Sequence, residues 1–513
     1  MKYAFSNEQM RRADAAAIAA GTPASELMER AGKALAKTVS DAMERKGLSD
    51  AIFVCGGGNN GGDGFVAARI LLDAGEDVCV LCLADRFSAE CERVRKAYYG
   101  DILREIPRRR YGVVVDCLFG TGLSRPIEGE NRALVDFINS GVYVIACDLP
   151  SGLGECGIAP EVCVRADETV AMGQMKLALL LSDGADVAGR VSVAEIGISS
   201  EDAGAEVWEA ADVRNFFPKR RSNSHKGNYG AACLLAGGAY SGAAFLAAGA
   251  CLKAGCGYTK LCVSSQLFPY AVGKFPAVIL KEFKSIDGDI LGANCIAAGM
   301  GSGVSEQLYV HIAELLGVYT GTLVLDADAL NTIAAYGTEV LEKKTCRVIL
   351  TPHPKEFARL VGKSVGEVLA DAVHEAKAFA ARCGVTVVLK NNRSIITDGN
   401  RIAVNPTGSP ALAKGGSGDV LSGLLAGTCA RGVRPFEAAC VASWLLGRAG
   451  EIAAERLGEY SAAPTAGTAC RPALRRTWTL AAPPAPARTA WPRQCWPLPL
   501  SAAPCAPACR WWK

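Results

Sequence analysis

The chain has 513 residues, of which 50% are hydrophobic and 21% charged, and this composition excludes a disordered, collagen-like or coiled-coil protein. The length exceeds one ordinary domain, so we expect two domains of about 200–250 residues each. The formal net charge of +3 misleads, because residues 461–513 contain no Asp or Glu. The rest of the chain is mildly acidic, which disfavours nucleic acid or a membrane surface as a partner.

The cysteines and the N-terminus indicate the compartment. The 21 cysteines are scattered singly, which is typical of reduced, buried thiols in a cytosolic protein. Cys79 and Cys82 form a C-x-x-C, but no second pair lies at zinc spacing, so a buried strand is the favoured interpretation. No apolar signal region begins the chain, and the uncharged residues 229–252 are interrupted by Gly237 and Gly238. The sequence therefore predicts a cytoplasmic protein that does not enter a membrane.

The first half alternates helices with short apolar strands. One helix follows Ser6, which can cap it, and a second begins near Ser25. Apolar segments typical of buried strands then recur at residues 51–55, 77–83, 111–117, 142–148 and 168–171. Strand, turn and helix repeated in this order predict a mostly parallel sheet with helices on both faces.

A polar, basic segment at residues 217–227 marks the predicted joint between the domains. After it, apolar strand segments recur at residues 231–235, 259–263, 295–299, 322–326, 347–351 and 385–390. The halves do not repeat each other, so we expect two different α/β domains, residues 1–212 and 213–460. Residues 461–513 are rich in proline and tryptophan and lack periodicity, which predicts a tail that is disordered or arises from a frameshift.

A glycine-rich segment follows the first of these strands and opens a helix. From Gly56 to Gly64 it reads GGGNNGGDG. Glycines let backbone amides approach an anion closely, and the N-terminus of the following helix adds partial positive charge. The segment therefore predicts a phosphate or pyrophosphate site rather than a plain turn.

Two further loops follow predicted strands. One starts at Asp116 and continues into a glycine turn, and the other runs from Asp148 to Gly152. In an open α/β sheet, the carboxyl ends of the strands form the ligand crevice. Either Asp alone could equally cap a helix, but three loops converging on one crevice indicate a binding site.

Together these motifs resemble the YjeF N-terminal family, the NAD(P)HX epimerases, which have a Rossmann-like three-layer αβα fold. The resemblance rests on NNGGDG, VDxLFGTGL and DLPSG and covers residues 1–212. It implies a potassium ion, which hard carboxylate, amide and hydroxyl oxygens suit, bound by Asn60, Asp116 and Ser151. It implies substrate contacts from Asn59, Asn60, Gly61, Gly62, Asp63, Gly120, Thr121, Gly122, Leu123, Ser124, Arg125, Pro126 and Asp148. Asp116 and Asp148 are both candidates for the proton-transfer residue, and an Asp116 bound to potassium would be the poorer base.

The second half has its own glycine-rich segment, KGGSGDVLSG, which starts at Lys414 and precedes a helix. Its backbone amides can stabilise charge on a transferring phosphoryl group. Asp419 lies at its mouth and can take a proton from the attacking hydroxyl. His353 lies between two prolines after a predicted strand, and by itself it is as readily structural as functional.

This half resembles the ribokinase-like ADP-dependent NAD(P)H-hydrate dehydratases, which also have an αβα fold. The resemblance adds HKGNYG at residues 225–230, glycine turns at 237–238 and 299–303, and LDADAL at 325–330. It implies that Asp419 is catalytic and that the substrate contacts Ala243, Gly301, His353 and Asp419. It implies adenine-nucleotide contacts from Lys390, Asn391, Asn392, Arg393, Ser394 and Gly418. Here the chain departs from the family, because the usual LKGAGT reads LKNNRS.

The fusion of the two domains resembles the bifunctional NAD(P)H-hydrate repair enzymes. The first domain would interconvert the R and S forms of NADHX or NADPHX. The second would use ADP and Mg²⁺ to phosphorylate the C6 hydroxyl of the S form and then eliminate phosphate. The resemblance also implies a homo-oligomer such as a homotetramer. Two alternatives stay open: a ribokinase-superfamily kinase for a vitamin or sugar, and a first domain that only binds or serves as an RNA-processing scaffold.

Overall fold

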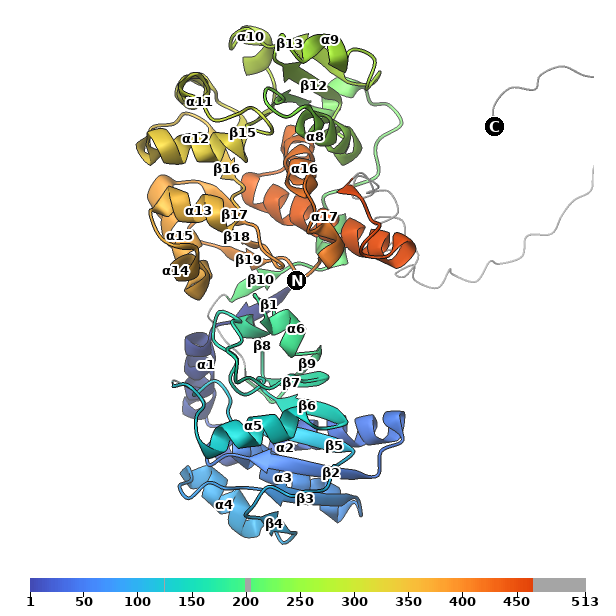
Figure 1. The fold of residues 1–513 in the computed structure, drawn as a ribbon, viewed down its shortest axis with the longest axis vertical. Coiled ribbons are helices and arrows are strands. Elements are labelled where there is room, and N and C mark those ends of the chain that lie inside the picture. Colours follow the sequence, from blue (N-terminus) through green and yellow to red (C-terminus); the bar gives the residue numbers. More distant parts are fainter. Residues whose placement is uncertain (124, 199–203, 465–513) are drawn as a thin grey trace, which may run out of the picture.

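The computed structural model describes residues 1–123, 125–198 and 204–464, in which the chain builds two sheets, one above the other in Figure 1. The smaller sheet has the strand order β4-β3-β2-β5-β6-β7-β9. The larger has the order β13-β12-β11-β14-β15-β16-β17-β18-β19-β10-β1-β8. Ser124 and residues 465–513 of the predicted tail lie outside the described residues.

The smaller sheet is parallel throughout. Its strands are β2 (Asp50–Cys55), β3 (Asp77–Leu81), β4 (Ile102–Leu103), β5 (Val113–Cys117), β6 (Tyr143–Cys147), β7 (Glu168–Met172) and β9 (Arg190–Ala194). One face packs against α2 (Ala24–Lys46), α3 (Asn59–Asp73) and α4 (Ala89–Ala97), and the other against α5 (Glu130–Asn139). The apolar segments are fully buried because helices cover both faces, so the predicted three-layer arrangement is confirmed.

The larger sheet is parallel from β13 to β17 and antiparallel from β17 to β19. Its strands include β11 (Ala231–Leu235), β12 (Tyr258–Val263), β13 (Ile279–Glu282), β14 (Cys295–Ala298), β15 (Thr322–Leu325), β16 (Arg347–Leu350), β17 (Thr386–Leu389), β18 (Ile395–Thr397) and β19 (Ile402–Val404). One face packs against α8 (Ser241–Ala254), α16 (Ser417–Ala430) and α17 (Pro435–Leu457). The other packs against α11 (Glu306–Val318), α12 (Asp328–Tyr336), α13 (Pro354–Val361), α14 (Val365–Ala370) and α15 (Ala372–Cys383).

Short elements complete the described chain. Helix α1 (Asn7–Ala19) starts at Ser6, whose hydroxyl accepts from the Gln9 amide as predicted. The remaining helices are α6 (Gly184–Val187), α7 (Ala210–Arg214), α9 (Phe268–Ala271), α10 (Gly288–Leu291), η1 (Leu177–Leu179), η2 (Lys226–Tyr229), η3 (Thr338–Leu341) and η4 (Pro410–Leu412). No helix among the described residues is long and apolar enough to cross a membrane, and the uncharged segment at 229–252 contains the predicted strand β11 and most of α8. Every cysteine that the structure describes is a free thiol.

Three strands from the first 212 residues extend the larger sheet. They are β1 (Lys2–Phe5), β8 (Met175–Lys176) and β10 (Ala205–Val207), and they lie between the two halves of the molecule in Figure 1. β10 pairs with β19, and β1 pairs with both β10 and β8. Across this junction Arg401 Nε lies 2.9 Å from Glu206 Oε1, and within the second half Arg401 Nη1 lies 2.7 Å from Glu437. The halves are therefore joined by a continuous sheet as well as by a connecting segment.

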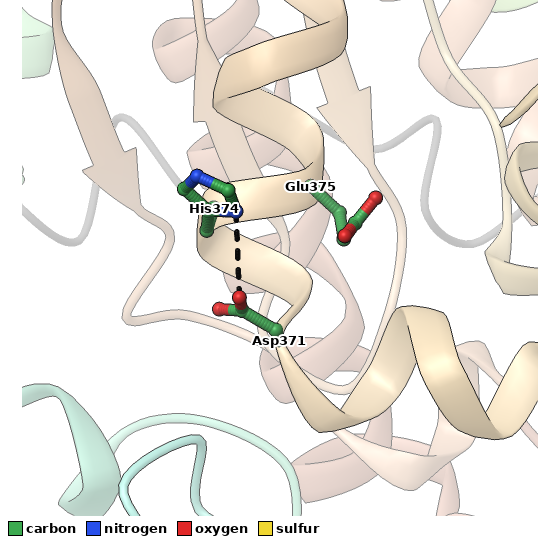
Figure 2. A group of neighbouring side chains, drawn as sticks. All are labelled: Asp371, His374 and Glu375. Atoms are coloured by element: carbon green, nitrogen blue, oxygen red, sulfur yellow. Dashed lines mark ion pairs between the residues drawn. The ribbon is translucent and has the colours of Figure 1, made fainter.

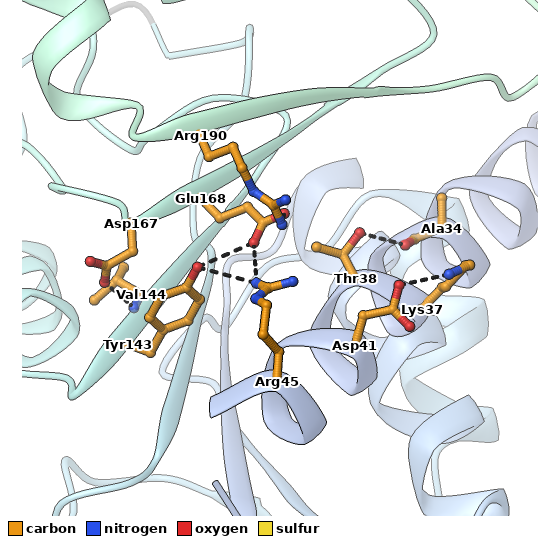
Figure 3. Close-up of polar contacts among 10 residues, drawn as sticks. All are labelled: Ala34, Lys37, Thr38, Asp41, Arg45, Tyr143, Val144, Asp167, Glu168 and Arg190. Carbon is orange, nitrogen blue, oxygen red and sulfur yellow. Dashed lines mark hydrogen bonds and ion pairs between the residues drawn. The ribbon is translucent and has the colours of Figure 1, made fainter. Parts of the chain in front are cut away.

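A buried carboxylate secures the amino edge of the smaller sheet, away from the strand ends that form binding crevices. The Glu168 side chain is 3% exposed and pairs with Arg45 at 3.0 Å and with Arg190 on its other oxygen. Tyr143 donates to the Arg45-facing oxygen at 3.2 Å (Figure 3). Both carboxylate oxygens are occupied, so this network holds β6, β7, β9 and α2 together and leaves no free atom for chemistry.

Replacing Glu168 with Gln should lower the free energy of unfolding by about 1.5–3 kcal/mol, since hydrogen bonds to a charged group contribute that much. Urea denaturation followed by circular dichroism measures the loss. The matched control is Glu161→Gln, whose carboxylate pairs with Arg132 but is 82% exposed, and exposed pairs contribute about 0.2–1 kcal/mol. Equal stability of the two variants would contradict this interpretation.

Candidate active sites

The first site lies at the carboxyl edge of the smaller sheet, where the chain leaves β2, β5 and β6. The glycine-rich segment is the start of a helix rather than a free loop: α3 begins at Asn59 with Gly58 as its N-cap, and Asp63 lies in its second turn. Gly61 and Gly62 are buried against Gly56 and Met28, where a Cβ atom would overlap both neighbours. These glycines therefore bring the helix N-terminus close to the sheet, which suits an anion.

Asp116 and Ser151 form a buried pair at this edge. The Ser151 hydroxyl donates to Asp116 Oδ1 at 2.7 Å, and the Ser151 amide donates to Asp116 Oδ2, also at 2.7 Å. The Leu118 amide adds a third bond at 3.1 Å. Burial raises the pKa of Asp116 to about 6, against the lowering effect of the Ser151 bonds. A carboxylate held by three donors is a poor candidate for moving a proton.

Asn60 lies beside the loop that follows β5. Phe119 donates its amide to the Ser151 hydroxyl at 2.8 Å, and the next residue, Gly120, lies beside Asn60, because a Cβ atom there would be 3.5 Å from Asn60 Oδ1. Both polar atoms of the Asn60 side chain are buried without a hydrogen-bond partner in the described part of the chain. An orphaned amide oxygen near a buried carboxylate and hydroxyl is a donor set that fits a hard cation such as potassium.

The rest of the predicted substrate loop is open to solvent. Gly122, Arg125 and Pro126 are exposed, and Gly120, Thr121 and Leu123 are half-buried. Asp148 reaches the same place from the end of β6, because a Cβ atom on Gly120 would also lie 3.5 Å from Asp148 Oδ2. The structure thus brings the predicted residues of the three loops to one edge.

The second site lies at the carboxyl edge of the larger sheet. Lys390, at the end of β17, pairs with Asp326 at 2.9 Å and lies 3.8 Å from Glu356. The Ser422 hydroxyl donates to the other oxygen of Asp326 at 2.7 Å. Burial alone would raise the pKa of Asp326, but the Lys390 ammonium and these bonds hold it below the ordinary value. Burial raises the pKa of Glu356 to about 7, opposed by Lys390.

Asp419 lies in the first turn of α16, beside this charge cluster. Its neighbour Gly418 is next to the ammonium, because a Cβ atom there would be 3.4 Å from Lys390 Nζ and 3.7 Å from Asp326 Oδ2. Burial, with the negative charge of Asp326, raises the pKa of Asp419 to about 6. No hydrogen bond engages the Asp419 carboxylate among the described residues, so its oxygens are available to a ligand. A carboxylate with a pKa near the working pH suits a general base.

His353 is the N-cap of α13. Its Nδ1 accepts from the amides of Lys355 and Glu356 at 3.1 and 3.2 Å, so the proton of the neutral ring is on Nε2. Burial and the charge of Lys390 lower the pKa of His353. The side chain is nevertheless 47% exposed, so the residue that caps the start of α13 is also open to a ligand.

Ala243 and Gly301 are in contact at the same edge, since a Cβ atom on Gly301 would lie 3.1 Å from Ala243 Cβ. Two residues after Gly301, the Gly303 amide donates to Asp328 Oδ2 at 2.8 Å, and the charge of Asp328 contributes to the raised pKa of Asp419. Lys390 and Gly418 lie inside the cluster. Asn391 and Asn392 are exposed, and Asn392 donates instead to the Ser182 carbonyl of the first half. Ser394 and Arg393 are half-buried, and Arg393 Nη1 has no partner among the described residues.

Comparison with known proteins identifies both halves. Residues 24–178 match the family described as the YjeF-related protein N-terminus, and residues 232–470 match the NAD(P)H-hydrate dehydratase family. A bifunctional NAD(P)H-hydrate repair enzyme of Thermofilum pendens is 37% identical over 84% of this chain and 88% of its own length. The chain belongs to this family of bifunctional repair enzymes. The enzyme of the same name from Escherichia coli is 31% identical over 84% of this chain and 86% of its own.

Among solved structures, a Bacillus subtilis ADP/ATP-dependent NAD(P)H-hydrate dehydratase co-crystallised with ATP and Mg²⁺ is 30% identical. It covers 54% of this chain and 98% of its own length, with a TM-score of 0.47. The two family matches and the relative from Thermofilum pendens confirm the predicted family.

Repair-family motifs do not account for every charged group at the two edges. Three of these charged residues were not predicted from the sequence: Lys176, which pairs with Asp148 at the first site, and Asp326 and Glu356, which lie beside Lys390 at the second. Lys176 is a single cation in the apolar segment from Met175 to Leu181. A lone charge in an apolar segment is the signal that could have found it, because a buried charge requires a partner.

A third group of potential ligands, Asp371, His374 and Glu375, lies at the start of α15 (Figure 2). Asp371 Oδ2 is 3.4 Å from His374 Nδ1, and both side chains are more than half exposed. Glu375 is neutralised by Lys363 at 2.6 Å. We assign no metal to this repair-enzyme surface, because its ligands are exposed and one is already paired.

Proposed function

We propose that the two edges perform the two steps of nicotinamide nucleotide repair, with residues 1–212 as the epimerase unit and 213–460 as the dehydratase unit. The first would interconvert R and S NADHX or NADPHX, and the second would convert the S form to NADH or NADPH. The observation that carries this proposal is that both edges contain the motif residues of a family to which the chain belongs along its length.

The first edge binds the substrate in this proposal through the α3 N-terminus and the loop at residues 120–126. Asn60, Asp116 and Ser151 would hold potassium, for which the orphaned Asn60 amide is the supporting observation. Asp148 is the better of the two candidate bases, because three donors already engage Asp116. One oxygen of Asp148, by contrast, faces the loop.

At the second edge, the glycine segment before α16 would hold the phosphoryl group being transferred from ADP. Asp419 would accept the proton of the C6 hydroxyl as its oxygen attacks the β-phosphorus of ADP and AMP leaves. Loss of a proton from C5 and of phosphate from C6 would then form the C5–C6 double bond of the dihydronicotinamide. Hydroxide is a poor leaving group and phosphate a good one, which is why the nucleotide is consumed. Mg²⁺ bound with the nucleotide would neutralise the negative charge of the phosphates, and Lys390 and Gly418 would lie beside them.

A cytoplasmic location and a homo-oligomer, such as a tetramer, complete the proposal. Free thiols throughout the described residues support a reducing compartment.

The test is recovery of the dihydronicotinamide absorbance from a mixed R and S hydrate sample, with ADP, with ATP and with neither nucleotide. Recovery of the whole mixture with one nucleotide supports both activities and identifies the phosphoryl donor. Recovery of the S fraction alone would overturn the epimerase assignment. A stable phosphorylated product without recovery would overturn the dehydratase assignment and favour a kinase.

The proposal also predicts a pH dependence for the dehydratase step. Asp419 must be ionised to accept a proton, and its pKa is about 6, so kcat/KM for the S hydrate should fall about tenfold per pH unit below that value. Initial release of inorganic phosphate, corrected for a sample without enzyme, measures the rate. A profile that stays level well below pH 6 would contradict Asp419 as the base.

A further inference from the structure

Lys176 is a buried ammonium that the proposed chemistry has not yet used. Its side chain is 2% exposed. It forms an ion pair with Asp148 Oδ1 and also donates to the Met172 carbonyl. Desolvating an ammonium is costly unless it is paired, so Lys176 is committed to Asp148.

Asp148 is held unusually firmly. Its φ of 66° lies in the left-handed region, which a non-glycine residue adopts at a cost that the surroundings must offset. Its amide donates to the Val170 carbonyl at 2.8 Å, and its Oδ1 accepts from the Met172 amide at 3.1 Å as well as from Lys176. Oδ1 is therefore fully engaged.

The second oxygen of the same carboxylate is free. Oδ2 has no hydrogen-bond partner in the described part of the chain, and it faces Gly120 in the predicted substrate loop. The contrast with Glu168 is informative: both of its oxygens are bonded, as a purely structural ion pair requires. Lys176 thus clamps one oxygen of Asp148 and leaves the other directed at the site.

Two more carboxyl groups share this ammonium. Burial raises the pKa of Asp14, on α1, and raises that of Asp63, on α3, well above the ordinary value. In both, the negative charge of Asp148 adds to the rise and Lys176 opposes it. One cation therefore faces three carboxyl groups, and its direct ion pair is with Asp148.

We propose that Lys176 is a positioning residue for epimerisation, holding Asp148 so that Oδ2 takes the proton of the substrate's C6 hydroxyl. This inference rests on the proposed epimerase function. As the proton moves to Oδ2, the C6–N1 bond breaks, C6 becomes an aldehyde, and the electron pair goes to N1 and into the conjugated carboxamide. Rotation about C5–C6 presents the other face of the aldehyde. N1 then attacks C6, and Oδ2 returns the proton to the oxygen, giving the opposite epimer with atoms and charges balanced.

The test follows conversion of R-enriched NADHX to the S form by chromatography, using the full chain without nucleotide and subtracting the rate without enzyme. Lys176→Met should lower kcat about 10²-fold, the effect of a small misplacement of a reacting group, with little change in KM. The matched control is Lys344→Met, which removes an ammonium bonded to two backbone carbonyls in the second half and should leave epimerisation unchanged.

A double-variant cycle separates positioning from structure. If Lys176 acts through Asp148, adding Lys176→Met to Asp148→Asn should slow the reaction no further, and Lys176→Arg should recover part of the loss in the single variant. Urea denaturation followed by circular dichroism shows whether each variant is folded. The role of Lys176 would be overturned if the rate losses of the two single variants multiplied in the double variant. A Lys176→Met variant as fast as wild type would overturn it as well. A wild-type chain that does not accelerate the interconversion would instead overturn the epimerase function itself.

Discussion

Replacing Asp419 with Asn is expected to lower the rate of S-hydrate dehydration by about 10²–10⁴-fold, the contribution of a positioned general base. Asn has nearly the same shape but cannot accept the proton of the attacking hydroxyl. Asp419 makes no hydrogen bond among the described residues, so the substitution breaks no contact on which the fold depends. The loss should therefore appear in kcat, measured from phosphate release at saturating ADP.

The epimerase half provides the internal control for this variant. Asp419→Asn should convert R to S hydrate at the wild-type rate, since the two edges belong to different sheets. The matched substitution is Asp371→Asn, in the same half, whose side chain is 57% exposed and should retain full dehydration. An Asp419→Asn variant that dehydrates normally, or one that also loses epimerisation, would show that this carboxylate has another role.

Much of the fold follows from local sequence. The strand predicted at residues 231–235 has those bounds in β11, and the other predicted core strands shift by a few residues at most. Continuous apolar segments bounded by turn residues are typical of strands in a sheet that helices cover on both faces. The strands that join the halves were not predicted, because β1, β8 and β10 are too short for a periodic pattern and pair only in the folded chain.

The residues of the two sites that lie in contiguous motifs were also predictable from the sequence. Glycine motifs and strand-end aspartates placed Asp116, Asp148 and Asp419, because these signals are contiguous in sequence. The pairing of Asp326 with Lys390 was not predicted. The two residues are 64 positions apart and follow the strands β15 and β17, so they meet only through the order of the strands in the sheet. The first glycine segment, with six glycines in nine residues, was predicted to open a helix, and in the structure that helix already begins inside the segment, at Asn59.

The two edges share an arrangement of charged residues that neither glycine motif predicts. Each has a lysine paired with an aspartate that follows a strand: the buried Lys176 with Asp148, and the half-buried Lys390 with Asp326. In both, further carboxyl groups with raised pKa surround the pair, among them Asp63 and Asp419. At each edge, one lysine ammonium therefore offsets the repulsion among several carboxyl groups whose pKa values differ. Groups with different pKa values at one site are what acid–base chemistry requires.

Because of this arrangement, Lys390→Met should be the most destabilising of the substitutions considered. It leaves Asp326, whose side chain is 2% exposed, as a buried carboxylate without a cation, and breaking such a pair costs about 3–5 kcal/mol. Urea denaturation of the full chain, followed by circular dichroism, measures the loss. The exposed Lys355 on nearby α13 provides the control, as Lys355→Met should leave the unfolding midpoint unchanged.

The pH dependence of this loss identifies its cause. The folded pKa of Asp326 lies below its ordinary value, so the stabilisation it provides is present above the unfolded pKa and disappears as the pH falls through the folded pKa. Without Lys390, burial raises the pKa of Asp326, and the carboxyl group is protonated at higher pH. The difference between wild type and Lys390→Met should therefore shrink toward acid pH. Adding Asp326→Asn to Lys390→Met should restore most of the stability at neutral pH, because no buried charge is then left alone. A double variant no more stable than Lys390→Met would show that Lys390 stabilises the fold through its other contacts rather than through this pair.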